Sequence, residues 1–193
     1  IRPNAAEALG NIGPDATAAV PALTAALSDN DSYLRWQAAA SLIKIGPTAR
    51  PAVPTLIKVL QDDSEEKVRW RAAFAIGKID PTPAAIPVLL DALKRDRSVQ
   101  VRAYAAFALA RIGSTMQGTT PEIDNALNAS VPELIKTLKD EDPNVRVSAA
   151  FALREIGPNA RSAVPALTEA LKDDNDYVRT TAASALARIH SPK

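Results

Sequence analysis

The chain of 193 residues carries eight aromatic side chains, and each stands at a fixed distance from a recurring dipeptide of an apolar residue and arginine. If the apolar residue of that dipeptide is offset 0, the rings occupy only offsets −1, 2, 3 and 6. They are Tyr33, Trp36, Trp70, Phe74, Tyr104, Phe107, Phe151 and Tyr177. Aromatic and arginine side chains dominate binding hot spots because they bury a large area at modest entropic cost. The chemistry that these residues offer is therefore recognition of a partner.

Basic side chains accompany the rings. Arg71 shares offset 3 with Tyr104, and offset 10 is basic in four repeats, where it carries Lys44, Lys78, Arg111 and Arg188. Cations near the C-terminal end of a helix complement the helix dipole, which is sufficient reason for most of this pattern. A secondary consequence is a basic rim beside the rings, which could select an acidic segment of a partner.

Residues for catalysis are scarce. The sole histidine, His190, stands in the last predicted turn, where a capping role is expected. The absence of cysteine excludes disulfides, thiolate metal sites and cysteine nucleophiles. The sequence has no glycine-rich phosphate loop, His-Glu metal spacing or nucleophile elbow. We therefore predict a protein that is not an enzyme and that needs neither metal nor cofactor.

Three markers recur in a fixed order and define the elements that carry these residues. They are an apolar-proline pair, the apolar-arginine dipeptide, and an isoleucine before a chain-reversing residue. The isoleucines, from Ile12 to Ile189, are 33, 34, 33, 44 and 33 residues apart. Such a period is typical of stacked supersecondary units. We predict one domain, 1–193, made of a half repeat 1–13 and repeats 14–46, 47–80, 81–113, 114–157 (with an insertion at 114–130) and 158–193.

Each repeat reads as two helices, A and B. Helix A follows the apolar-proline pair, since proline is tolerated in a first turn. Helix B follows a polar turn, and its predicted N-caps are Asp31, Ser98, Asp142 and Asn175. The predicted C-terminal stops are glycines in a left-handed conformation, Gly13, Gly46, Gly113 and Gly157. Within the insertion, Thr120 is a cap candidate for an extra short helix over 121–129. No stretch alternates with period two, so the predicted class is all-α.

The aromatic offsets of helix B face away from its core. At 100° per residue, offsets 0, 4, 7, 8 and 11 cluster on one arc and are small or aliphatic, whereas offsets −1, 2, 3, 6 and 10 lie opposite. The outward offsets vary between repeats while the core offsets hardly change. We interpret Trp36, Trp70 and Tyr104 as partner contacts. For the three phenylalanines, packing against the neighbouring B helix remains an equal alternative, and Tyr33 and Tyr177 are rim positions beside the A–B turn.

The arginine at offset 1 recurs in all five complete repeats, as Arg35, Arg69, Arg102, Arg146 and Arg179. An aspartate stands near each preceding turn: Asp29, Asp62 or Asp63, Asp96, Asp140 and Asp173. A phosphate-binding row is one interpretation. Because the planar arginine head suits repeated pairing with carboxylates, we favour a structural Arg–Asp ladder between repeats.

The B-helix pattern, which reads VRAYAAFALARIG at 101–113 and VRVSAAFALREIG at 145–157, resembles HEAT repeats. It is most similar to the short HEAT-like repeats of phycobilin-lyase subunits. The resemblance implies a right-handed α-solenoid with A helices on the convex side and B helices on the concave side. It also points to the outward B offsets as a recognition surface, because artificial binders built on this repeat vary the same offsets.

Three functions are compatible with this resemblance. The first is a non-catalytic scaffold that binds a protein or peptide through the aromatic face. The second is a subunit of a bilin-lyase-like enzyme that cradles a tetrapyrrole, with rings stacking on the bilin and Lys or Arg meeting its propionates. The third is a DNA-binding module like the HEAT-like alkylpurine glycosylases, which the net charge of +1 disfavours.

Two expectations concern the setting of the chain. No apolar run approaches the ~20 residues needed to span a bilayer, so we expect a cytoplasmic protein. Ile1-Arg2 stands where a B helix would carry its dipeptide, yet no A helix precedes it. We therefore expect the chain to be part of a longer array.

Overall fold

The computed structural model describes residues 2–116 and 118–191, and within them every regular element is helical. The B helices are α1 (Pro3–Ile12), α3 (Ser32–Ile45), α5 (Glu66–Ile79), α7 (Val99–Met116), α9 (Pro143–Ile156) and α11 (Asp176–His190). The A helices are α2 (Val20–Ala26), α4 (Val53–Asp62), α6 (Ile86–Arg95), α8 (Pro121–Thr137) and α10 (Val164–Ala170). Four 3-10 segments precede A helices: η1 (Gly13–Ala19), η2 (Gly46–Ala52), η3 (Pro83–Ala85) and η4 (Gly157–Ala163). Ile1, whose predicted place is the start of the half repeat, lies outside the described residues.

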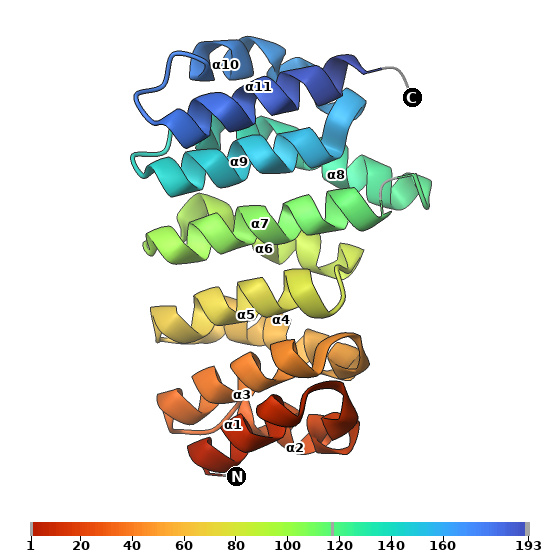
Figure 1. The fold of residues 1–193 in the computed structure, drawn as a ribbon, viewed down its shortest axis with the longest axis vertical. Coiled ribbons are helices and arrows are strands. Elements are labelled where there is room, and N and C mark those ends of the chain that lie inside the picture. The colour runs from red at the N-terminus through yellow and green to blue at the C-terminus, as the bar shows by residue number, and fades with distance from the viewer. Residues whose placement is uncertain (1, 117, 192–193) are drawn as a thin grey trace.

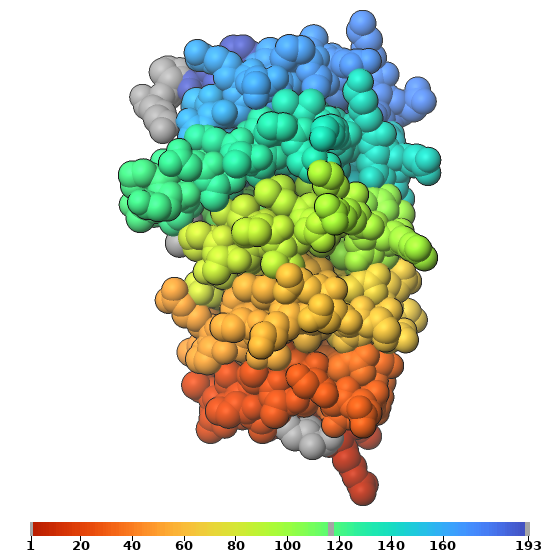
Figure 2. Space-filling view, turned by 180° about the vertical axis from the view of Figure 1, so that it is seen from behind, coloured from red at the N-terminus to blue at the C-terminus, as the bar shows by residue number. Residues whose placement is uncertain are grey.

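The helices form two layers (Figure 1). The B helices stack side by side in one layer, and the A helices lie behind them, with the two chain ends at opposite ends of the stack. Seen from behind, the A-helix side appears as successive bands that follow the order of the repeats along the chain (Figure 2). Each repeat packs on its neighbours, so the core is continuous along the stack. The prediction of an all-α solenoid built from antiparallel helix pairs is confirmed.

Small residues let the B helices approach one another closely. Alanines at offset 4 are fully buried in every complete repeat. At Gly10 of α1 an added Cβ would lie 2.6 Å from the Oγ of Ser41 in α3, and that hydroxyl donates to the carbonyl of Ala6 at 2.7 Å. Successive A helices pack on one another less extensively than successive B helices do. Closer packing of the B layer is what its predicted place on the concave side requires, because a stack bends toward the side with the closer spacing.

The polar turns before the B helices cap them largely as predicted. The side chains of Asp31, Asp142 and Asn175 accept hydrogen bonds from backbone amides two residues later, at 2.9, 2.8 and 2.9 Å. Each bond satisfies a donor that has no partner within the helix. Ser98 stands before α7, but its hydroxyl contacts the Oε1 of Gln100 at 3.2 Å. These caps fix where each B helix begins, and with it the direction of the outward offsets.

Glycines end three of the B helices. Gly13, Gly46 and Gly157 have φ values of 75°, 80° and 61°. Their ψ values of −142°, −145° and −135° place them outside the ordinary left-handed helical region, in a part of φ/ψ space that only glycine occupies readily. The predicted stop is therefore confirmed at these positions, with a different backbone geometry from the one expected.

The prediction for Gly113 is wrong, and so is the extra short helix in the insertion. α7 continues through Gly113 to Met116, because no proline follows this glycine as one follows the other three. Thr120 does cap a helix, accepting from the amide of Ile123 at 3.4 Å. That helix is α8, which runs on through Pro132 as the A helix of the repeat. The start of α8 projects beyond the edge of the stack (Figures 1 and 2).

Candidate binding face

The outward offsets of helices α3, α5, α7, α9 and α11, namely −1, 2, 3, 6 and 10, form a surface that we name the B face. The rings at its middle touch one another across repeats. The Trp70 ring of α5 stacks on the Tyr104 ring of α7 with centroids 5.0 Å apart. The ring of Phe74 contacts those of Tyr104 and Phe107 at 5.2 and 5.5 Å. The structure thus brings together four of the predicted contact residues on two neighbouring helices.

Arg71 joins this group to the preceding repeat. Its guanidinium carbon lies 4.4 Å from the ring centroid of Trp36 on α3 and 4.3 Å from that of Trp70. Both distances are typical of cation–π contacts. Tyr33 extends the row, since its ring stacks on Trp36 at 5.9 Å. Rings and guanidinium therefore form one continuous row from α3 to α7.

The three phenylalanines have different surroundings. Phe74 and Phe107 pack mainly on other rings of the B face, and Phe107 also lies close to α5, where a Cβ added at Gly77 would come 3.5 Å from its Cδ1. Phe151 packs against the core, with the Arg154 guanidinium over its ring at 4.3 Å. All three are half-buried. They make contacts between side chains of the stack and also present part of each ring to the surface.

The two predicted rim tyrosines differ from the other rings in exposure. Tyr33 is 54% exposed and Tyr177 is 75% exposed, whereas Trp36, Trp70 and Tyr104 are half-buried and pack against the core. Tyr177 lies at the start of α11, apart from the ring row, and no ring contact involves it among the described residues. The row of rings consequently ends before the last repeat.

The basic rim is less regular than predicted. Lys78 lies over the rings of Phe74 and Phe107, at 5.6 and 5.9 Å, and Lys44 donates to the Oδ1 of Asn11 at 2.7 Å. Arg188 is exposed in the last turn of α11. Arg111 does not end its helix, because α7 continues to Met116, and its Nε is buried without a hydrogen-bond partner.

A hollow of about 400 Å³ opens beside the ring row, between α5, α7 and α9. Phe74, Tyr104 and Phe107 line its apolar side. Asn144 and Ser148 of α9 line the opposite side, together with Asp142, the N-cap of that helix. A hollow with aromatic walls and a few polar groups suits one apolar side chain of a bound segment. Sequence reasoning assigned no role to the α9 residues, because their types are ordinary for an exposed helix surface.

The offset-1 arginines form the predicted ladder, on the edge of the stack where the A–B turns lie. In each link the arginine Nε and Nη2 donate to both oxygens of an aspartate in the next repeat, at 2.6 to 3.0 Å. The links are Arg35–Asp63, Arg69–Asp96, Arg102–Asp140 and Arg146–Asp173. Asp63, not Asp62, is the partner in the first link. Arg179, in α11, pairs with Asp176 of the same helix.

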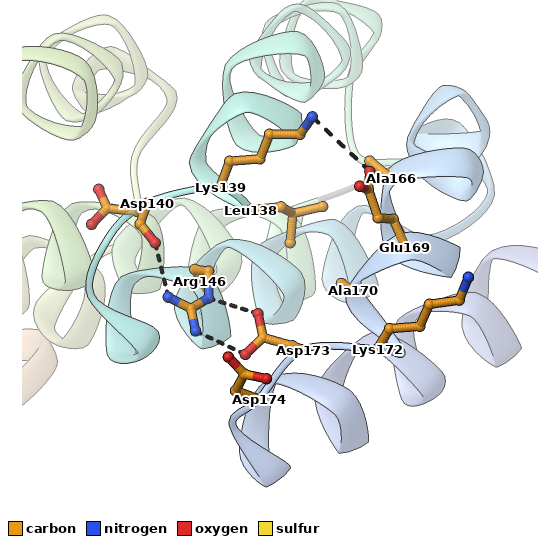
Figure 3. A pocket seen from close by; sticks show the side chains of 10 residues that line it. All are labelled: Leu138, Lys139, Asp140, Arg146, Ala166, Glu169, Ala170, Lys172, Asp173 and Asp174. Atoms are coloured by element: carbon orange, nitrogen blue, oxygen red, sulfur yellow. Dashed lines mark hydrogen bonds and ion pairs between the residues drawn. The ribbon is translucent and has the colours of Figure 1, made fainter.

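Each ladder arginine also binds backbone. Arg146 donates from Nη1 to the carbonyl of Asp140 at 2.9 Å, while Nε and Nη2 donate to Asp173 (Figure 3). Nη1 also donates to the carbonyl of Glu141, at 3.1 Å. These groups border a hollow of about 550 Å³ at the A–B turns. Because the arginine hydrogen bonds are occupied within the protein, this hollow offers no free cation of the ladder to a phosphate.

The ladder also shifts the pKa values of its members. Hydrogen bonding to Asp173 raises the pKa of Arg146 above its usual value, and the same bond lowers the pKa of Asp173. Burial acts to raise the pKa of Asp140, but hydrogen bonds from Arg102 and from the backbone amide of Asp142 prevail and lower it. On the B face the opposite happens, since burial lowers the pKa of Arg71. Hydrogen bonds in the ladder favour the charged forms of its side chains, whereas burial on the B face disfavours the charged form of Arg71.

Fold and site together define an α-solenoid whose B-helix layer carries an aromatic and basic face. A family model described as HEAT repeats matches residues 1–53, 53–127 and 131–193. The chain therefore belongs to the HEAT-repeat family. No match was found among curated protein sequences.

Solved structures with the same architecture include engineered and natural proteins. An engineered protein known from its crystal structure is 28% identical, with a TM-score of 0.76 over 97% of this chain and 89% of that one. A designed armadillo repeat protein in complex with the peptide (KR)4 has a TM-score of 0.78 over 97% and 91% of the two chains; at 21% identity it shows the fold alone. The CpcE–CpcF complex of phycocyanin lyase from Nostoc sp. PCC7120 is 25% identical, with a TM-score of 0.65 over 87% of this chain and 98% of that one.

No three His, Cys, Asp or Glu side chains in the described ranges come together as possible ligands of a metal ion. In the same part of the chain, no helix is both long enough and apolar enough to cross a membrane.

Proposed function

We propose that this protein is a non-catalytic scaffold that binds a protein or peptide segment on its B face. The observation that carries the proposal is the continuous row of partly exposed rings that runs from Tyr33 on α3 to Phe107 on α7. Apolar patches on the surface of a soluble protein are characteristic of interaction sites. The proposed contact residues are Tyr33, Trp36, Trp70, Arg71, Phe74, Tyr104, Phe107, Phe151 and Tyr177, with Lys44, Lys78, Arg111 and Arg188 at the rim.

The architecture supports this proposal. Stacked helix pairs create extended inward surfaces on which partners of solenoid proteins bind. Among the structures that share this fold is a designed armadillo repeat protein solved in complex with a peptide. On the B face, rings that already pack on one another lose little conformational freedom on binding, which favours affinity.

A selection from a displayed library of random dodecapeptides tests this function. The wild-type protein should enrich binding peptides, whereas the triple variant Trp36→Ala, Trp70→Ala and Phe107→Ala should enrich none. Circular dichroism should show that the triple variant keeps its helicity. The matched control replaces Lys58 and Lys94, exposed on the A helices α4 and α6, by alanine and should enrich the same peptides as wild type. Equal enrichment by the triple variant would disprove binding on the B face.

A tetrapyrrole is a second candidate ligand. It is favoured by the structural likeness to the CpcE–CpcF phycocyanin lyase and by the aromatic hollow beside Phe74, Tyr104 and Phe107. Lys78 is placed near those rings, where it can meet a propionate. Adding phycocyanobilin should then shift its absorption spectrum, and Phe107→Ala should remove the shift. An unchanged spectrum with the wild-type protein would eliminate this candidate.

A further inference from the structure

We propose that Arg71 is an anion-binding centre of the B face and that the segment bound there is an acidic peptide, with an aspartate or glutamate side chain on this guanidinium. The inference rests on the proposed function, because it names the chemistry of the partner that the B face binds.

Arg71 has the geometry of a prepared carboxylate site. Its guanidinium lies between the rings of Trp36 and Trp70, at 4.4 and 4.3 Å. When rings cover the two faces of a guanidinium group, the N–H groups at its edge remain available. These N–H groups form a planar fork that matches a carboxylate. The Nε of Arg71 is buried without a hydrogen-bond partner, and within 2–116 and 118–191 neither Nη forms a hydrogen bond or ion pair. A bound carboxylate would accept hydrogen bonds from the Nη groups.

Carboxylates that could pair with Arg71 are scarce on the outward offsets of the B helices. In the five complete repeats the outward B offsets carry one carboxylate, Glu155, which is already bound to Arg154 at 2.6 Å. The ladder aspartates near α5, Asp63 and Asp96, hold Arg35 and Arg69. A desolvated cation without a counter-charge is costly in an isolated protein. Binding an anion would remove this cost, which makes charge complementarity a driving force for the partner.

A second cation sets the spacing of the ligand. Lys78 stands seven residues after Arg71 on α5, which corresponds to about 10.5 Å along the helix. Lys78 lies over two rings, and no salt bridge involves it among the described residues. A segment in the polyproline II conformation has three residues per turn and advances about 3.1 Å per residue, so side chains three residues apart lie on the same side and about 9.3 Å from each other. Two acidic side chains three residues apart therefore match the two cations.

The hollow beside the ring row completes the site. Tyr104, which stacks on Trp70 next to Arg71, also lines this hollow with Phe74 and Phe107. An apolar side chain near an acidic one could occupy the hollow while the carboxylate lies on Arg71. The expected ligand is therefore an extended segment that combines acidic and apolar residues.

The same observations favour a peptide over a nucleic acid. Nucleic-acid affinity comes mainly from many phosphate contacts, and the net charge of this chain is only +1. The offset-1 arginines, which would be the natural phosphate row, are bound to aspartates. Two or three separated cations among rings suit a few carboxylates on a largely apolar segment.

The test uses the dodecapeptides enriched on wild-type protein. The enriched pool should contain more Asp and Glu than the starting library, with acidic residues preferentially three apart. Replacing the acidic residues of a selected peptide by Asn and Gln should weaken its affinity about 10- to 100-fold, as expected for loss of a charge-assisted hydrogen bond. Arg71→Gln should weaken the acidic peptide by a large part of this factor, because the Lys78 contact remains, and should leave the affinity of the amide form nearly unchanged. Fluorescence anisotropy of labelled peptides measures both effects.

Intrinsic fluorescence supplies a site-specific readout. The chain has two tryptophans, and both contact Arg71, so a carboxylate arriving there should alter their emission. The matched control is Arg95→Gln, an exposed arginine on α6 that should change neither affinity nor the fluorescence response.

Several results would overturn the inference, each in a distinguishable way. Enriched peptides without acidic bias, or equal affinity of the acid and amide forms, would leave peptide binding intact but remove the role of Arg71. A pool with no enrichment at all would reject both proposals. Tighter binding of a ten-residue oligothymidylate than of the acidic peptide would assign the face to single-stranded nucleic acid. Dimerisation by light scattering that Arg71→Gln abolishes would assign it to a second copy of the chain.

Discussion

Arg69 and Arg71 stand two positions apart on helix α5 and have opposite surroundings. Arg69 points to the turn edge, where it donates to both carboxylate oxygens of Asp96 and to the carbonyls of Asp63 and Ser64. Arg71 lies on the B face between two indole rings and has no acceptor among the described residues. Two positions on a helix differ by about 200°, so neighbouring arginines can face different sides of the stack.

Arginines therefore have two different roles in this repeat protein. Arginines that recur at one offset in every repeat join each repeat to the next, and their hydrogen bonds are used within the protein. Arg71 is unlike the residues at its offset in the other repeats, which are Gln37, Tyr104, Ser148 and Thr181. A residue that differs from repeat to repeat at one offset does not serve the contact that recurs between all repeats. The first kind stabilises the stack, and the second is the kind that the proposed function uses.

The largest expected loss of stability comes from breaking one link of the Arg–Asp ladder. Arg69→Ala should lower the free energy of unfolding by about 3 kcal/mol, because it leaves a mostly buried carboxylate and two carbonyls without their donor. The side chains of Arg69 and Asp96 are only 17% and 10% exposed. Urea denaturation followed by circular dichroism measures the loss. A change below 1 kcal/mol, on the scale of an exposed ion pair, would show that the ladder contributes little.

Acidification should act on the same ladder more gradually. The folded-state pKa values of Asp140 and Asp173 lie below the usual value of 3.8. At these two carboxylates the folded protein therefore binds fewer protons than the unfolded chain in this range. The stabilisation that they contribute is fully present above about pH 5 and is lost as the pH drops through and below about 4. Urea midpoints measured from pH 7 to pH 2.5 report the effect. In Asp173→Asn the stability should already be lower at pH 7, and the acid-dependent loss should be smaller than in wild type.

A smaller change in stability is expected on the B face. Arg71→Ala should alter the free energy of unfolding by no more than about 1 kcal/mol, the size of a cation–π contact at a surface. The substitution also removes a partly desolvated charge that has no counter-charge, which offsets part of the loss. The measurement is the same denaturation experiment as for Arg69→Ala. Equal losses for the two variants would contradict the division between stacking and recognition.

The smallest effect should come from an ion pair that belongs to neither set. Arg95 and Asp91 form an i, i+4 pair on α6 with 72% and 63% exposed side chains. Arg95→Ala should cost about 0.3–0.5 kcal/mol, because solvent and salt screen an exposed pair. Thermal unfolding at low and high salt checks this value. A loss comparable with that of Arg69→Ala would mean that burial is not what distinguishes the ladder.

Much of the fold could be predicted from the sequence because its determinants are local. The spacing of the isoleucine markers located the repeats, and Asp31, Asp142 and Asn175 located the starts of B helices, since a cap acts within two residues along the chain. The failure at Gly113 is local too. Glycine permits a stop, but without a following proline the helix can continue, and here it does.

The residues of the candidate site could be predicted from the sequence, but the contacts between them could not. The offset analysis placed all eight rings on the outward side of the B helices, and Tyr33 and Tyr177 are the exposed ones. It could not predict that Arg71 would contact Trp36 of the preceding repeat, because that contact depends on how far each repeat is shifted and rotated against the next. The same reason explains why the sequence left Asp62 and Asp63 as alternatives, of which the structure has Asp63.

The amino-acid sequence thus specified a stack of helix pairs, the small residues between neighbouring B helices and the side chains that face outward. Helix period, caps and prolines act over a few residues, so these features are written in short stretches of chain. The packing of repeats on one another decided which arginines are bound by carboxylates. It also placed Arg71 between two rings, without a carboxylate partner. Those contacts join residues that are 27 to 38 positions apart in the ladder and 35 apart between Trp36 and Arg71. They exist only once neighbouring helices have come together.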